Sequence, residues 1–252
     1  MNWNRFLNRS FLLCLVAPFF SCGVEDYVYL NPVETAYSVG VTRATITLPS
    51  GQPSEFRYYT IFYRIYISDI LSNSITSDAE RRNINPSLAT HYNTLDPYTA
   101  NDSNPPNNLV SIFNSLRYYS LYVSQDKITE IPLYDQLNSA SGGAVYLDFT
   151  DTSDAPFMTI NNPNGTRFYL FRAPGFTSLP DRLFYNTSGP GSLSEPITSD
   201  TNADVEQKSG VTPSPQYTYV SLYIAATGTD NNFAPLYSRP KHIGILRLFD
   251  LP

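Results

Sequence analysis

The chain has 252 residues, of which 42% are hydrophobic, 14% aromatic and only 15% charged. This composition supplies enough apolar surface for a large core and excludes an intrinsically disordered chain. Sixteen basic residues stand against 22 acidic ones, for a net charge of −6. The chain therefore lacks the basic excess that binds nucleic-acid phosphates or anionic lipid headgroups, and no nucleic-acid partner is expected. Twenty prolines and 20 tyrosines, without a long stretch of strong helix formers, argue against a helical bundle.

The first 20 residues combine a basic start with a short apolar run. Arg5 and Arg9 precede any acidic residue, and residues 11–20 are almost all apolar. A membrane-spanning helix needs about 20 apolar residues, and Pro18 disfavours a helix through this run. The pattern therefore predicts a signal peptide over residues 1–21.

The apolar run is followed by Ser21-Cys22-Gly23. At this point the sequence resembles bacterial lipoproteins, in which a small residue precedes a cysteine that is acylated and becomes the first residue after cleavage. The resemblance implies lipidation of Cys22, a lipidated tether over residues 22–26 and a membrane partner bound through acyl chains. Phe19 and Phe20 replace the usual leucine and small residue, which makes this a relaxed lipobox of the spirochaete type. Ordinary signal cleavage near this point is the alternative.

Cysteine usage agrees with lipidation. Cys14 would leave with the signal peptide, so Cys22 would be the only thiol and no intramolecular disulfide could form. The mature chain would keep 14 basic and 22 acidic residues, a net charge of −8, so its membrane attachment must come from acyl chains. Gly23 is not the aspartate that retains many lipoproteins at the inner membrane. The resemblance therefore implies the outer membrane, on either its surface or its periplasmic face.

The mature chain begins with strand patterns. Strands are predicted at residues 27–30, 43–48 and 56–67. The last of these, FRYYTIFYRIYI, is β-branched or aromatic at most positions. One of its faces carries Tyr59, Ile61 and Ile65 and is expected to face the core. The other face carries Tyr58, Phe62 and Tyr66.

The middle of the chain has the only helix signals. A polar stretch from 68 to 85 precedes predicted helices at 86–94 and 108–116, the second with apolar residues at i, i+3, i+4 and i+7. A segment rich in Gly, Pro, Ser and Asn, from 173 to 215, is expected to be a surface excursion. Further strands are predicted at 118–124, 144–149, 157–160, 167–172, 217–227 and 242–249.

These elements predict an all-β fold, namely a β-sandwich with one or two short helices. FRYYTIFYRIYI at 56–67 and YTYVSLYIAATGTDNNFAPLYSRPKHIGILRL at 217–248 resemble the C strand and the closing F–G hairpin of immunoglobulin-like or fibronectin type III domains. The resemblance implies insertions at about 68–116 and 173–215. The sequence has no internal repeat, so a single domain over residues 27–252 is the simpler expectation. An unrelated sandwich or an open barrel fits the short strands equally well.

Catalytic motifs are missing from the sequence. It contains no G-x-S-x-G, H-E-x-x-H, P-loop or C-x-x-C pattern. Its two histidines, His91 and His242, are expected to have surface or packing roles, because a general base needs a partner that the sequence does not reveal. No catalytic residue, cofactor or enzymatic activity is therefore predicted.

Two runs of acidic residues are candidate metal sites. Asp148, Asp151 and Asp154 follow a predicted strand, and their alternation with hydroxyls could coordinate Ca²⁺. The EF-hand spacing, glycine and glutamate are missing, so a polar turn is the simpler interpretation and no metal is predicted. Asp200, Asp204 and Glu206 form a similar run within 173–215.

Tyrosine is the more informative residue type, because it pairs a large apolar ring with a polar tip. The side chains named as a candidate ligand or partner surface are Tyr58, Phe62, Tyr66, Tyr118 and Tyr122. The alternative is that these rings pack beneath the insertions.

Together these features predict a lipid-anchored cell-envelope protein that acts as a binding or structural module for a protein or glycan partner. A carbohydrate-active envelope enzyme, which would need two suitably spaced carboxylates in a cleft, is one alternative. A solute-binding lipoprotein with an enclosed pocket is another.

Overall fold

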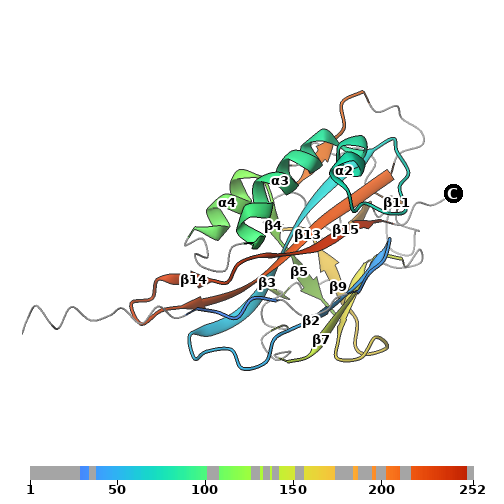
Figure 1. Cartoon of the computed structure of the whole chain (residues 1–252). Coiled ribbons are helices and arrows are strands. Elements are labelled where there is room, and N and C mark those ends of the chain that lie inside the picture. Colours follow the sequence, from blue (N-terminus) through green and yellow to red (C-terminus); the bar gives the residue numbers. More distant parts are fainter. Residues whose placement is uncertain are drawn as a thin grey trace, which may run out of the picture.

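The computed structural model describes residues 29–33, 38–100, 108–125, 131–132, 137, 142–150, 156–173, 184–186, 195–196, 203–210 and 217–248. Its strands form two main sheets that face one another, and helices cover the far side of one of them (Figure 1). The predicted all-β sandwich with insertions is confirmed. The described residues contain three helices, one more than the sequence suggested.

The helix-covered sheet is built on β3 (Phe56–Ser68) and β13 (Tyr217–Thr229), two 13-residue strands that run antiparallel. Their β-branched and aromatic residues favour extended backbone. β13 also pairs with β14 (Pro235–Tyr237) and β15 (Lys241–Arg247), and β3 pairs with β4 (Tyr119–Ser120) and, in parallel, with β12 (Val205–Gln207). No described strand pairs with the second edge of β15, which is therefore an edge strand.

The second sheet is an antiparallel array of seven strands. Their spatial order is β1 (Ser38–Val39), β2 (Arg43–Thr47), β7 (Ala144–Asp148), β8 (Phe157–Ile160), β9 (Phe168–Phe171), β5 (Tyr122–Ser124) and β6 (Ile131–Pro132). A separate ribbon pairs β10 (Tyr185–Asn186) with β11 (Glu195–Pro196).

The main core lies between the two sheets. The predicted inward face of β3 is confirmed from Tyr59 to Ile67, because its side chains there are fully buried in this core, whereas Arg57 at the start of the strand is exposed. They pack with alternate residues of β13 and with the inward side chains of β2 and β7. Fully burying one such side chain contributes roughly 1.5–3 kcal/mol, so this layer is the principal source of stability.

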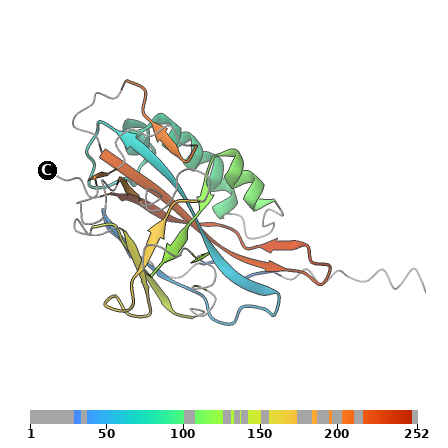
Figure 2. The same ribbon diagram turned by 180° about the vertical axis from the view of Figure 1, so that it is seen from behind.

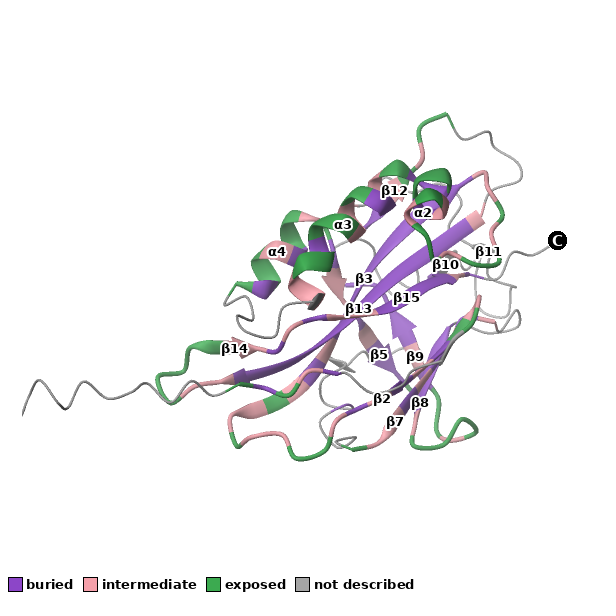
Figure 3. Cartoon of the chain, in the orientation of Figure 1, coloured by how far each residue is buried: buried purple, intermediate pink, exposed green. Residues whose placement is uncertain are grey.

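Three helices form a second layer on the opposite face of the helix-covered sheet (Figure 2). They are α2 (Asp78–Ile84), α3 (Pro86–Ala100) and α4 (Leu109–Ser115). Their apolar residues pack against the sheet and their outer faces are exposed, whereas β3, β13 and β15 are largely buried (Figure 3). The predicted insertion at 68–116 is thus a cover for one sheet face.

A buried ion pair ties β12 to the second sheet. Arg172, directly after β9, donates to both carboxylate oxygens of Asp204, at 2.8 and 2.5 Å, and both side chains are almost fully buried. The Tyr63 hydroxyl donates to the same carboxylate at 2.7 Å. Removing one partner of such a pair leaves an uncompensated buried charge, so the three residues fix β12 against the sandwich.

Most predicted strands match the structure to within two residues, with a few corrections. Tyr29 and Leu30, the described residues of the predicted strand at 27–30, are not in a strand. The predicted strand at 118–124 is split into β4 and β5, which belong to different sheets. Helix α2 lies in the polar stretch at 68–85, for which the sequence favours a loop or a short helical turn, and β12 lies in the predicted surface excursion. No helix in the described ranges combines the length and apolarity needed to cross a membrane.

Candidate functional site

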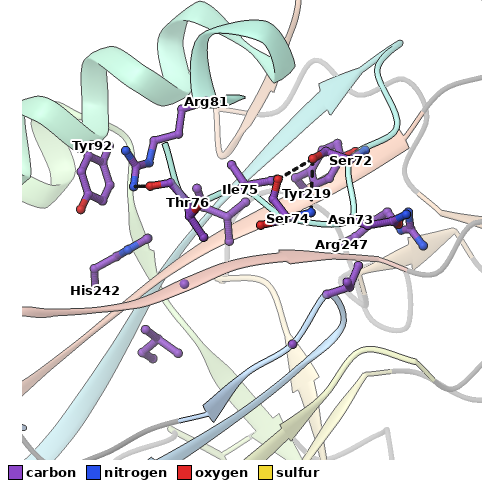
Figure 4. A pocket seen from close by; sticks show the side chains of 15 residues that line it. Ser72, Asn73, Ser74, Ile75, Thr76, Arg81, Tyr92, Tyr219, His242 and Arg247 are labelled. Atoms are coloured by element: carbon purple, nitrogen blue, oxygen red, sulfur yellow. Dashed lines mark hydrogen bonds between the residues drawn. The ribbon is translucent and has the colours of Figure 1, made fainter. Parts of the chain in front are cut away.

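A groove of about 420 Å³ lies along the edge strand β15. Its walls are β15, the loop of residues 72–76, and side chains from α2 and α3 (Figure 4). Serine, asparagine and threonine residues line the loop side, and residues of β15, with Gly40 and Val41, line the other. This volume falls in the range typical of small-molecule sites.

Arg81 is positioned in the groove by the start of α2. Ser77 and Glu80 form a capping box at that helix terminus, so the register of the following turn is fixed. Arg81 is only 8% exposed. Its Nη2 donates to the carbonyl oxygen of Thr76 at 2.9 Å, and its guanidinium lies 3.5 Å from the centre of the Tyr92 ring. The guanidinium is therefore held between a carbonyl group and an aromatic face.

The charge of Arg81 has no acidic counterpart among the described residues. No described carboxylate forms an ion pair with it, and its buried Nε has no hydrogen-bond partner. The acids of its own helix are engaged elsewhere: Asp78 pairs with Arg82, and Glu80 accepts from the backbone N–H groups of Thr76 and Ser77. A buried charge is normally paired. A buried arginine without a described acidic partner is therefore unusual, and this one lines a groove.

His242, on β15, stands beside this cation. Its ring lies 5.0 Å from Tyr92 and 4.7 Å from Tyr223, centre to centre. Burial, and then the positive charges of Arg81 and Lys241, lower its pKa to about 3. The imidazole is therefore neutral at physiological pH, and its Nε2 has no partner among the described residues.

The far end of the groove is held by hydrogen bonds from Tyr219 of β13 and Arg247 of β15 to the segment of residues 70–73. The Tyr219 hydroxyl accepts from the backbone N–H of Ser72 at 2.8 Å and donates to the carbonyl of Ile70 at 2.7 Å. Arg247 donates from Nη1 to the Asn73 side chain at 3.0 Å. These contacts fix the 72–76 loop opposite β15. The groove therefore presents cations, hydroxyls and amides, and no carboxylate is among its described lining residues.

Three of the five predicted surface aromatics are buried. Phe62, Tyr66 and Tyr118 are 0–2% exposed and lie beneath the helices. The Tyr66 hydroxyl contacts His91 Nδ1 at 2.8 Å and the Tyr118 hydroxyl at 3.2 Å. The interpretation of these three residues as an open surface is therefore wrong. They pack beneath an insertion, which is the alternative that the sequence left open.

The other two predicted aromatics, Tyr58 and Tyr122, are partly exposed. Tyr58 lies on β3 and Tyr122 on β5, in the second sheet, where it packs beside Phe171. The five residues therefore do not form one continuous surface.

Only some of the acidic residues considered as metal ligands lie in the described part of the chain. Both oxygens of Asp148 accept hydrogen bonds, Oδ2 from Arg43 at 2.9 Å and Oδ1 from the backbone of Thr150 at 2.8 Å. Asp151, Asp154, Asp200 and the lipidation candidate Cys22 lie outside the described residues. Within the described part of the chain, no group of three His, Cys, Asp or Glu side chains is placed to hold a metal ion.

The second acidic run has a structural role where it is described. Asp204 is the buried partner of Arg172. Glu206 forms a 2.5 Å ion pair with Arg64, a buried residue on the helix side of β3. These acids neutralise arginines within the fold.

The sequence did not reveal the groove. The sequence predicts only surface or packing roles for His242, and it places Arg81 in a polar stretch that is expected to be a loop or a short helical turn. The available signal was Ser77-x-x-Glu80, a capping-box pattern that predicts a helix start and places Arg81 in its second turn. The absence of an acidic partner could be seen only once the fold was known.

Comparisons of the chain with protein-family models, curated proteins and solved structures found no match. The likeness to immunoglobulin-like and fibronectin type III domains therefore stays a prediction beyond the sandwich itself.

Proposed function

We propose that this chain is a lipid-anchored cell-envelope protein that acts as a binding module, and that the groove along β15 is its ligand site. The observation that carries the binding role is Arg81, an almost fully buried cation that lines the groove without an acidic partner in the described chain. Folded proteins pair their buried charges, and a ligand can supply the missing partner.

The lining of the groove supports recognition over catalysis. Glycoside hydrolysis uses two carboxylates that flank the bond to be cleaved, and the described residues of the groove contribute none. Its histidine is held neutral, with a pKa near 3, far from the range in which a general base works best at neutral pH. The volume of the groove fits a small ligand better than a flat protein partner.

The anchor is supported by the N-terminal sequence. A basic start, a short apolar run and Ser21-Cys22-Gly23 follow one another within 23 residues. Each buried methylene contributes about 0.8 kcal/mol, and one acyl chain gives only marginal attachment, so durable anchoring requires a multiply acylated Cys22. Gly23 favours the outer membrane.

Cys22→Ala tests the anchor. The variant should move from the membrane fraction to the soluble fraction without unfolding, because the acidic mature chain has no electrostatic attraction to anionic lipids. The matched control is Cys14→Ala, which should stay with the membrane because this residue leaves with the signal peptide. The measurement is cell fractionation, with circular dichroism to verify the fold. A Cys22→Ala protein retained in the membrane fraction contradicts the proposed anchor.

A further inference from the structure

We propose that the groove along β15 binds a small ligand through an anionic oxygen group, a carboxylate or a phosphate, and that Arg81 is the counter-ion. This inference rests on the proposed binding function and specifies the chemistry of the ligand. It follows from the charge, the geometry and the size of the site.

The charge balance of the site calls for an anion. The chain carries six more acidic than basic residues, yet Arg81 is buried in a groove whose described lining has none of these acids. A second arginine, Arg247 of β15, also lines the groove. An uncompensated buried cation costs several kcal/mol, and an anionic ligand group offsets this cost.

The geometry of Arg81 suits an oxyanion. Thr76 and Tyr92 fix the guanidinium on two sides, so little side-chain entropy remains to be lost on binding. A guanidinium has five N–H donors, and one of those of Arg81 is used by the Thr76 carbonyl. Carboxylate and phosphate oxygens accept such donors in pairs, with charge-assisted hydrogen bonds of about 2.7–2.9 Å.

The groove offers space and polar groups beyond the anionic group itself. Its volume of about 420 Å³ exceeds that of a single oxyanion and leaves room for an organic body. Tyr92 and Ile75 provide apolar contacts, and Ser74 adds a polar wall (Figure 4). His242 lies close to the Tyr92 ring, and its buried Nε2 atom has no partner among the described residues.

Calorimetric titration of the full-length purified protein with inorganic phosphate and with acetate tests the proposal. Wild-type protein should bind at least one of these probes saturably. Arg81→Gln should weaken this binding at least tenfold. Arg81→Lys should retain part of it, because the charge remains while the planar fork is lost. Arg82→Gln is the matched control: this neighbouring arginine is exposed and paired with Asp78, so its loss should change the affinity less than twofold.

Titration with glucuronate and with glucose 6-phosphate shows whether the groove prefers a carboxylate or a phosphate group. Neutral glucose is the reference. Preference for glucuronate identifies a carboxylate ligand, and preference for glucose 6-phosphate identifies a phosphate ligand. Equal binding of the oxyanions to wild type and Arg81→Gln, or no binding of either to wild type, overturns the inference.

Failure of the inference can be separated from failure of the proposed function. Ser74→Trp fills the groove without removing a charge. If glucose binds wild type and this variant abolishes the binding, the groove is a ligand site for neutral molecules and only the anionic specificity is wrong. Circular dichroism of each variant confirms that lost binding is not lost folding.

Discussion

At the scale of single residues, the most informative side chains are polar ones that the fold has buried. Arg172 and Asp204 neutralise one another within the sandwich, and Tyr66, Tyr118 and Ser221 form a hydrogen-bonded chain beneath the helices. Such satisfied groups specify one arrangement of the core. Arg81 differs because no described carboxylate pairs with its charge, which makes it a functional candidate and not simply another buried polar residue.

The two histidines make stability depend on pH. Burial lowers the pKa of His91 to about 4, with Arg64 contributing, and that of His242 to about 3. An unfolded histidine has a pKa near 6.5. Between pH 6.5 and 4 the unfolded chain therefore binds protons that the folded chain does not, and the free energy of unfolding falls as the pH is lowered. The slope approaches about 1.4 kcal/mol per pH unit for each such proton.

Urea denaturation at pH 7 and at pH 5 measures this effect. The carboxylates whose pKa values are lowered, Asp69 and Glu80, remain ionised throughout this interval, so the histidines dominate the change. His242→Gln should reduce the loss of stability between the two pH values relative to wild type. An identical pH dependence in the variant would show that His242 does not titrate on unfolding as described.

At the scale of elements, α2 connects the local sequence to the groove. Its Ser77 side chain accepts from the Glu80 backbone N–H at 3.2 Å, and the Glu80 carboxylate accepts from the Ser77 N–H at 2.7 Å. The cap sets the turn that carries Arg81, and the Thr76 carbonyl, just before the cap, holds the guanidinium. The capping box thus determines both where α2 begins and where the Arg81 guanidinium lies.

Ser77→Ala should therefore have two effects. Loss of the cap should reduce the free energy of unfolding by about 1 kcal/mol, and oxyanion binding should weaken because Arg81 is less well positioned. The control is Ser209→Ala, an exposed turn serine, for which we expect a change within about 0.5 kcal/mol. Urea denaturation and titration with phosphate measure the two effects. Unchanged stability and affinity in Ser77→Ala would contradict this role for the cap.

Elements determined by interactions between neighbouring residues could be predicted from the sequence, and features that depend on distant contacts could not. Period-2 alternation in β3 identified the strand and its inward face, because both depend on neighbouring residues. The same alternation does not show whether the other face of β3 is exposed or covered by another part of the chain. A tyrosine such as Tyr66 has the same sequence signal whether its hydroxyl meets water or His91. The groove depends on contacts between α2 and β15, which are about 160 residues apart in the chain, and no local pattern records them.

At the scale of the whole molecule, the central ladder joins distant parts of the chain. β3 and β13 pair along almost their full length, so the sheet can form only when the N-terminal and C-terminal halves meet. The helices are then held on the sheet by side chains that both layers share. The clearest is Phe113 of α4, fully buried and stacked on Phe62 of β3 with ring centres 4.3 Å apart.

This shared packing predicts that the helical layer and the sandwich unfold together. Phe113→Ala should reduce the free energy of unfolding by about 3–5 kcal/mol, because it removes a buried ring and leaves a cavity. Val110→Ala, an exposed change in the same helix, should have little effect. The two layers can be followed separately, by far-ultraviolet circular dichroism for the helices and tyrosine absorbance for the buried rings. Coincident transitions, shifted together in Phe113→Ala, indicate one cooperative unit. If the helical signal is lost first while the tyrosines of the sheet stay buried, the cover over β3 is an independent layer, and α2 could then release Arg81 from the groove without unfolding the sandwich.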